Sequence, residues 1–224
     1  MNECIGEAIT LTEGELVTLL GGVGKASLFG FEIKTEISAA EAACCLNSLV
    51  RRNVLESKDD GFCITDKYAS VIRSVLFSEK QVEIRSKGRL YAIVYCGEET
   101  VFVRKNSISK DKILLETISA EGLLRKLTDE GILPSKDEDQ ALSRQLPKQE
   151  DILSADVRKV CEENGCTAET ADGSECAAFV NIGLCSAVIS RIRDVYKCCV
   201  YSSQSALECL GRLLIKEGEN SDNG

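Results

Sequence analysis

One stretch of the chain constrains its fold more than any other, because residues 39–85 run through helical, turn and strand patterns in a fixed order. Apolar residues recur at helical spacing from Ala39, and two short apolar runs then flank Lys58-Asp59-Asp60-Gly61. An Asp-Gly pair between such runs predicts a tight hairpin. A second helical pattern then leads into an alternating run that ends at Arg85. The order helix, hairpin, helix, strand is typical of winged-helix modules, so the sequence raises the question of DNA binding.

Capping signals mark where the first two helices start. Thr12 is followed three residues later by Glu15, and Ser38 by Glu41. At this spacing each hydroxyl accepts a hydrogen bond from the backbone amide of the Glu, and each carboxylate accepts one from the amide of the capping residue. The sequence therefore predicts a short helix over residues 12–20 and a longer one that starts at Ser38.

The first predicted helix ends at two glycines, and the segment that follows, GGVGKAS, has some likeness to a phosphate-binding loop. That loop needs a glycine five residues before its Gly-Lys pair and a strand in front of it. Here the position is Leu19, and a helix precedes it. We interpret the segment as a helix end followed by a turn, with no nucleotide site.

The remaining patterns predict an α+β fold, in which the winged-helix-like segment leads into an antiparallel sheet with flanking helices. In the first half, strands are expected at 81–85, 90–96 and 100–104, followed by a helix at 119–130. In the second half, a helix is expected at 154–164, strands at 177–182, 187–193 and 196–201, and a last helix at 205–216. Three strands and a leucine-rich helix end both halves, a pattern compatible with a quasi-two-fold duplication, and whether the halves are a true repeat stays open.

A polar stretch without periodicity, residues 135–150, separates the halves and predicts a linker. The predicted domains are 1–134 and 151–218, followed by a disordered tail at 219–224.

Twelve cysteines and no histidine limit the chemistry that the chain can perform. Without histidine the usual Ser/His and Cys/His nucleophile pairs and the mixed zinc sites are excluded, and no two cysteines form a CxxC pair. No acidic cluster has a catalytic setting either. We therefore expect no enzyme activity, no cofactor and no metal, with a redox or metal protein built on the cysteines as a third hypothesis.

The start of the chain, MNECIGEAIT, contains neither Lys nor Arg, and no apolar stretch is long enough to span a bilayer. These features favour a cytoplasmic protein without membrane insertion. In a reducing compartment its cysteines are expected to remain free thiols.

A DNA-reading module needs cations that face phosphates, and this one offers Arg51, Arg52 and Lys58. The chain as a whole has a formal net charge of −9, whereas DNA-binding domains usually carry a basic face. Acidic residues also interrupt the cations, at Glu41, Glu56, Asp59 and Asp60. A winged-helix transcription regulator, with a C-terminal half that senses a ligand or forms a dimer, is therefore the second hypothesis.

Several segments in order resemble the cytosolic substrate chaperones of type VII secretion, the EspG-type proteins. The resemblance covers residues 9–134 and extends more loosely to the second half. It is carried by LTEGELVTLLG, CLNSLVRRNVLESKDDGF, ITDKYASVIRSVLFSEKQVEIR, LYAIVYCGEETVFVRKN and LLRKLTDEGILP.

This resemblance implies a non-catalytic chaperone or adaptor that holds the apolar tip of a helical secreted protein or heterodimer. A binder of that kind needs an apolar groove with a polar rim, and a negative net charge does not oppose it. Whether the chain forms a homodimer stays open. The contact regions implied by the resemblance are the turn Cys96, Gly97, Glu98, Glu99 and Thr100 and the leucines Leu207, Leu210, Leu213 and Leu214. On the residues alone, the turn is also typical of a plain hairpin and the leucine row of a core.

Overall fold

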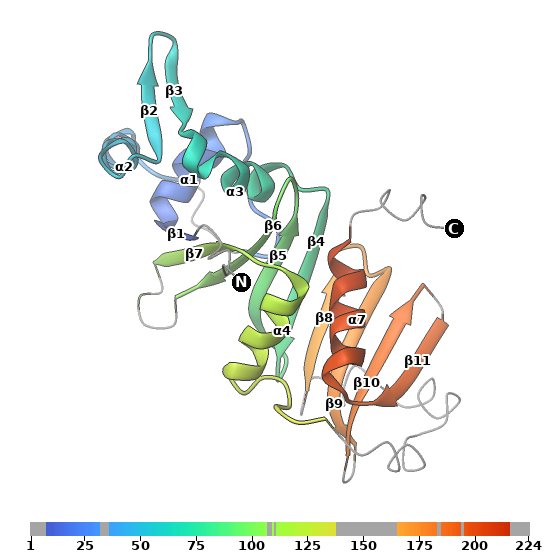
Figure 1. Cartoon of the computed structure of the whole chain (residues 1–224). Coiled ribbons are helices and arrows are strands. Elements are labelled where there is room, and N and C mark those ends of the chain that lie inside the picture. The colour runs from blue at the N-terminus through green and yellow to red at the C-terminus, as the bar shows by residue number, and fades with distance from the viewer. Residues whose placement is uncertain are drawn as a thin grey trace. The chain divides into compact units, whose positions relative to one another are not determined.

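The computed structural model describes residues 8–31, 36–106, 109, 111–137, 165–182, 185–193 and 195–215. Within these residues it contains an antiparallel sheet of nine strands in the order β1-β7-β6-β5-β4-β8-β9-β10-β11, together with a separate hairpin, β2-β3, and helices (Figure 1). The predicted α+β fold class is confirmed. The predicted helix at 154–164, most of the linker at 135–150 and the tail at 219–224 lie outside the described residues.

Contacts within the chain divide it into two compact units. Unit 1 comprises residues 1–79 and 95–117, and unit 2 comprises residues 80–94 and 118–224. The domain boundary expected at the linker stays a prediction, because most of that linker is not described.

Unit 1 begins with a strand that leads directly into a helix. Helices α1 and α2 start as the capping signals predict. The Thr12 hydroxyl accepts a hydrogen bond from the amide of Glu15, and the Ser38 hydroxyl accepts one from the amide of Glu41. The carboxylates of Glu15 and Glu41 in turn accept hydrogen bonds from the amides of Thr12 and Ser38. The elements of unit 1 are β1 (Ala8–Thr12), α1 (Glu13–Gly22), α2 (Ala39–Arg51), β2 (Leu55–Lys58), β3 (Gly61–Ile64), α3 (Asp66–Phe77), β6 (Thr100–Lys105) and β7 (Lys112–Thr117).

Strands β1 and β7 were not predicted from the sequence. They pair antiparallel, with Ile9 opposite Leu115 and Leu11 opposite Ile113, and all four side chains are buried. Each strand is only five or six residues long, and β1 runs straight into the cap of α1. The capping signal of α1 therefore led us to predict only a helix here, although the apolar residues of β1 alternate as in a strand.

The predicted hairpin is present. Lys58 pairs with Gly61, so the turn lies at Lys58-Asp59-Asp60-Gly61 as predicted, with Asp59 and Asp60 as its two central residues. Gly61 has a φ of 140°, a conformation that side-chain-bearing residues rarely adopt.

Unit 2 contains a second set of strands and the two helices that pack on each other, α4 and α7. The three strands predicted for the second half are confirmed as β9, β10 and β11, whereas β8 was not predicted because its residues lie in a stretch interpreted as polar. The elements of unit 2 are β4 (Lys80–Ser86), most of β5 (Arg89–Cys96), α4 (Ala120–Asp129), β8 (Cys166–Thr170), β9 (Glu175–Ile182), β10 (Cys185–Ile192), β11 (Val195–Val200) and α7 (Ser203–Leu214).

The strand order supports the expected internal duplication. Each half of the chain supplies four consecutive strands followed by a helix, β4 to β7 with α4 and β8 to β11 with α7. The two sets meet where β4 pairs antiparallel with β8.

Candidate functional site

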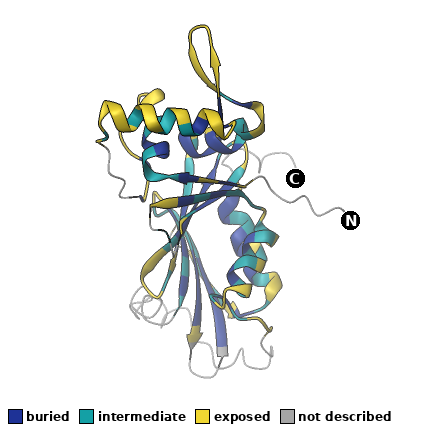
Figure 2. Cartoon of the chain, turned by 90° about the vertical axis from the view of Figure 1, so that its left-hand side faces the viewer, coloured by how far each residue is buried: buried dark blue, intermediate teal, exposed yellow. Residues whose placement is uncertain are grey.

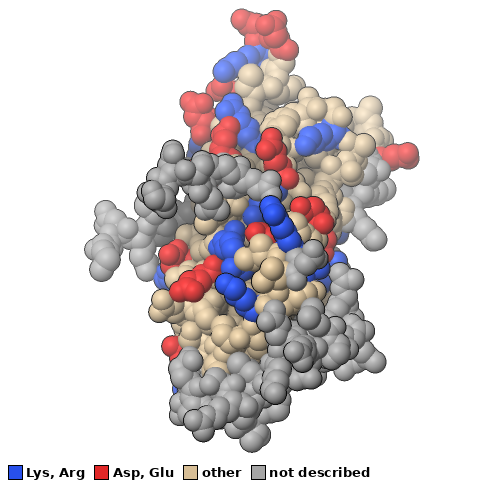
Figure 3. Space-filling view, turned by 90° about the vertical axis from the view of Figure 1, so that its right-hand side faces the viewer, with Lys and Arg blue, Asp and Glu red and all other residues tan. Residues whose placement is uncertain are grey.

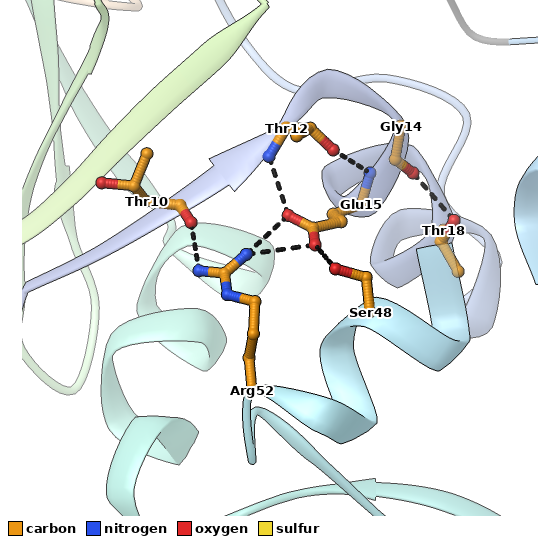
Figure 4. A network of polar contacts seen from close by, with 7 residues as sticks. All are labelled: Thr10, Thr12, Gly14, Glu15, Thr18, Ser48 and Arg52. Atoms are coloured by element: carbon orange, nitrogen blue, oxygen red, sulfur yellow. Dashed lines mark hydrogen bonds and ion pairs between the residues drawn. The ribbon is translucent and has the colours of Figure 1, made fainter. Parts of the chain in front are cut away.

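Arg52, one of the three cations predicted for DNA contact, is bound to a buried carboxylate inside unit 1 (Figure 4). Its Nη1 donates to Oε2 and Oε1 of Glu15 at 2.9 and 3.0 Å, and its Nη2 donates to the carbonyl of Thr10. Ser48 on α2 donates its hydroxyl to the same carboxylate at 2.6 Å. Since these partners lie on β1, α1 and α2, the network fixes α2 in place.

The Glu15 side chain is only 3% exposed, so its charge state depends on this network. Burial alone would raise the pKa of the carboxyl. The hydrogen bonds from Ser48 and the Thr12 amide, together with the charge of Arg52, outweigh burial and hold the pKa of Glu15 below its ordinary value. Glu15 is therefore ionised at neutral pH, and the charge of Arg52 is used inside the protein.

The other two DNA-contact candidates differ from each other. Lys58 pairs with Glu56 at 2.8 Å on the exposed hairpin, and its hydrogen bond to Glu56 raises the pKa of its amine. Arg51 is exposed at the end of α2. Arg52 and Lys58 are each paired with a carboxylate, so Arg51 is the predicted cation whose side chain could most readily contact a phosphate.

Helix α2 presents an exposed surface of small, uncharged side chains, including Ala40, Ala43, Cys44 and Asn47 (Figure 2). Within α2 only Leu49 is buried. Figure 3 shows the side opposite to that of Figure 2, and there the described Lys and Arg side chains are interspersed with Asp and Glu.

The predicted contact turn between β5 and β6 is packed tightly on α3. A Cβ added to Gly97 would lie 2.5 Å from Cα of Ser74, and the Ser74 hydroxyl accepts from the amide of Glu99 at 2.8 Å. Cys96 is buried, Thr100 is half-buried, and Glu98 and Glu99 are exposed. The turn is thus a docked hairpin that leaves two carboxylates at the surface of unit 1.

The predicted contact leucines of α7 are mostly core residues. Leu210, Leu213 and Leu214 are buried in unit 2, and Leu207 is half-buried. This placement matches the core interpretation of the leucine row. The turn and the leucine row also belong to different compact units.

Several large apolar side chains of unit 1 are exposed, and no pattern in the sequence distinguishes them from core residues. The Tyr95 hydroxyl donates to the carbonyl of Phe29 at 2.7 Å, which holds a tight turn that leaves the Phe29 ring at the surface. On α3, the Phe77 ring is 55% exposed with the Lys25 ammonium 5.2 Å from its centre. The exposed set in unit 1 is Val23, Phe29, Val50, Phe62 and Phe77.

The GGVGKAS segment forms the helix end and turn that were predicted. Amides of Gly24 and Lys25 donate back to carbonyls of α1, and the Lys25 ammonium donates to the carbonyl of Leu76 at the end of α3. Beside it lies an open groove of about 770 Å³ in unit 1, with Val17, Leu20, Lys25, Ile37 and Ala42 among its lining residues.

The described residues contain neither a cluster of metal ligands nor a helix that could span a membrane. No group of three or more His, Cys, Asp or Glu in that part of the chain is arranged to hold a metal ion. None of the described helices has the length and apolarity that crossing a membrane demands. The free cysteines there include exposed Cys44, Cys63 and Cys199 and buried Cys96, Cys166 and Cys209.

No protein-family model matches the sequence, and no curated protein sequence does either. Among solved structures, the fold is similar to that of the Mycobacterium tuberculosis type VII secretion system chaperone EspG5, which was solved in complex with a PE25-PPE41 dimer. The TM-score is 0.54 and the sequence identity 8%, over 93% of this chain and 96% of that one. At this identity the likeness establishes a shared fold.

Proposed function

We propose that the chain is a non-catalytic cytoplasmic chaperone or adaptor that binds a helical substrate of type VII secretion. The observation that carries the proposal is the fold likeness to a type VII secretion chaperone over 93% of this chain and 96% of that chain. Because nearly the whole of both chains takes part, the likeness is not that of one small, widely shared module. A fold alone does not fix a function, so the surface has to support the assignment as well.

The surface of unit 1 supports a protein partner. Its exposed phenylalanines, Phe29, Phe62 and Phe77, offer the apolar contacts by which helices are recognised, and the exposed carboxylates Glu98 and Glu99 offer polar contacts. The network around Glu15 holds α2 rigidly, which lowers the entropy cost of binding.

The competing hypothesis of a DNA-binding regulator has less support from the same surface. It requires Arg51, Arg52 and Lys58 to contact phosphates, yet Arg52 is bound to Glu15 and Lys58 to Glu56. It therefore serves as the second arm of the test.

To test the proposal, the purified full chain is mixed in turn with each small helical exported protein encoded beside its gene. We expect one of them to form a stoichiometric complex in size-exclusion chromatography with light scattering, with a Kd measured by calorimetry. An unrelated helical protein of similar size is the control. Failure of every candidate, together with duplex DNA binding that the pair Arg51→Ala and Lys58→Ala abolishes, would favour the regulator instead.

A further inference from the structure

The open groove of unit 1 continues into an exposed aromatic ring. The groove lies between α1, the segment after it and the start of α2, and Val17, Leu20 and Ile37 contribute apolar side chains to its lining. Lys25 also lines it, and the ammonium of Lys25 lies 5.2 Å from the centre of the Phe77 ring at the end of α3. That ring is 55% exposed, so it extends the apolar surface of the groove onto α3.

The turn between β5 and β6 adds carboxylates beside this ring. The amide of Glu99 donates to the hydroxyl of Ser74 at 2.8 Å, and Ser74 lies three residues before Phe77 on α3. Since residues three apart on a helix are neighbours on its surface, the turn lies next to the Phe77 ring. Glu98 and Glu99 are exposed there. A third exposed carboxylate, that of Glu36, is among the lining residues of the groove.

The charge of this surface favours a basic partner. Lys25 is a cation of the groove, but its ammonium already donates to the carbonyl of Leu76 and faces the Phe77 ring. The three carboxylates, by contrast, are exposed to solvent. A partner that covers them needs cations opposite them, because like charges brought together across an interface repel each other.

The backbone around the groove favours a helix over an extended segment. An extended peptide binds by adding main-chain hydrogen bonds to a free sheet edge. None of the described lining residues lies in a strand, and the amides of Gly24 and Lys25 donate back to carbonyls of α1. A segment bound here therefore has to satisfy its own backbone groups, as a helix does.

We propose that this surface of unit 1 binds one amphipathic helix of a partner protein, whose apolar face enters the groove and contacts Phe77. Lys or Arg residues beside that face then lie opposite Glu36, Glu98 and Glu99. The inference rests on the proposed function, because it describes the part of a helical partner that unit 1 recognises. Burial of the apolar face supplies affinity, and the charge pairs at the exposed rim set the rate of association and the choice of partner.

The β2-β3 hairpin provides an internal comparison. It carries a phenylalanine of similar exposure, Phe62 at 51%, and two adjacent exposed acids, Asp59 and Asp60. None of these three residues is among those that line the groove. The hairpin thus offers the same kinds of side chain outside the groove, and substitutions there are matched controls.

The test uses two synthetic peptides of about 18 residues, or five helical turns, cross-linked between turns so that they are helical before binding. Both have the same leucine face, which is flanked by Lys in one peptide and by Glu in the other. Calorimetry with the full chain should give a Kd for the Lys peptide about tenfold lower than for the Glu peptide. Phe77→Ala should weaken binding of the Lys peptide about tenfold, and Phe62→Ala less than about twofold.

No binding of the Lys peptide, equal binding of the Glu peptide, or equal losses in Phe77→Ala and Phe62→Ala would overturn the proposal. Thermal melting checks that each variant is folded. As a second variant, Ala26→Arg places a bulky cation at an exposed lining position and should abolish binding of the Lys peptide. Undiminished binding by Ala26→Arg would place the peptide elsewhere and refute the site.

The charges are tested by neutralising one acidic pair at a time. Glu98→Gln with Glu99→Gln should weaken the Lys peptide about threefold to tenfold and make its binding less sensitive to salt. Asp59→Asn with Asp60→Asn removes the same charge from the hairpin and should leave the Kd unchanged. Equal losses in the two double variants would show that only the net charge of the chain attracts the peptide, against the proposal.

The proposed function and this surface can fail separately. If an exported protein encoded beside the gene forms a stoichiometric complex that Phe77→Ala and Ala26→Arg do not weaken, the proposed function holds and the docking surface is wrong. If no such complex forms while the peptides behave as expected, the surface binds a basic amphipathic helix and the secretion partner is wrong.

Discussion

Arg52 in unit 1 directly follows α2, and Arg212 in unit 2 lies in the last turn of α7. The two guanidiniums differ in whether their donors have acceptors. Arg52 donates to both oxygens of Glu15 and to the carbonyl of Thr10, whereas Nε and Nη2 of Arg212 are buried with no acceptor. The Arg52 guanidinium is bound within the fold, whereas two donors of Arg212 have no acceptor among the described residues.

The two helices are held in different ways, which explains the contrast. Helix α2 buries only Leu49, so polar contacts must fix it. Helix α7 buries an apolar face consisting of Ala206, Cys209, Leu210, Leu213 and Leu214. Because burial of that face suffices to attach α7, the fold does not need an ion pair at Arg212.

The largest effect is expected from breaking the apolar attachment of α7. Leu213 is 0% exposed, so Leu213→Ala removes buried methyl groups and leaves a cavity, at a cost of about 2–5 kcal/mol in the free energy of unfolding. Half-buried Leu207→Ala is the control and should cost clearly less. Urea unfolding followed by circular dichroism measures both. Equal losses would mean that α7 is not anchored by this face.

The second largest effect is expected where the turn after β5 contacts the backbone of α3 in unit 1. Gly97→Ala places a methyl group against the backbone of Ser74, so α3 and the turn must separate, at a cost of about 1–3 kcal/mol. Gly21→Ala in α1 is the matched control, because no atom lies within 4 Å of its added Cβ and alanine favours a helix. Unfolding in urea should show Gly97→Ala destabilised and Gly21→Ala unchanged or stabilised. A neutral Gly97→Ala would contradict the packing of the turn.

The two arginines themselves give the most direct test of the comparison. Arg52→Met leaves the buried Glu15 carboxylate without its cation and should lower the free energy of unfolding by about 2 kcal/mol. Arg212→Met removes unpaired buried donors and should be neutral or stabilising. Exposed Arg51→Met is the control. If Arg212→Met were as harmful as Arg52→Met, both guanidiniums would be structural.

The smallest effect concerns pH. The pKa of Glu15 is lowered in the folded state, so the group stabilises the protein above the pKa of the unfolded chain, and this stabilisation is lost as pH falls through the folded value. We expect the melting temperature to fall below about pH 4.5 and Glu15→Gln to flatten that fall.

Asp172 in unit 2 provides a comparison for this loss of stability at acidic pH. Hydrogen bonds from Thr170 and Ser174 lower its pKa to about 2, so its contribution is lost at a lower pH than is usual for an aspartate. Asp172→Asn should therefore flatten only the most acidic part of the profile. An identical profile in Glu15→Gln and the wild type would show that the Glu15 network adds no pH-dependent stability.

Local signals in the sequence were sufficient for the helix starts at Thr12 and Ser38, the hairpin turn near Asp60 and the meander strands. Each of these depends on residues three or four positions apart or on strict alternation, so the chain specifies them before it folds. The short strands β1 and β8 were not predicted, because β1 adjoins a helix cap and β8 lies in a polar stretch.

The candidate site depended on the tertiary structure. The sequence identified Arg52 as a cation but could not show that its partner is Glu15, 37 residues away, and it identified the last helix as apolar without showing that Leu213 is buried. The same holds for Gly97 against Ser74. The sequence by itself determined the local elements and their order, because hydrogen bonds and periodicity act over a few residues. Only the tertiary structure decided which charged side chains are paired inside the protein and which surfaces remain exposed. Those contacts join residues that are far apart in the sequence and become neighbours only on folding.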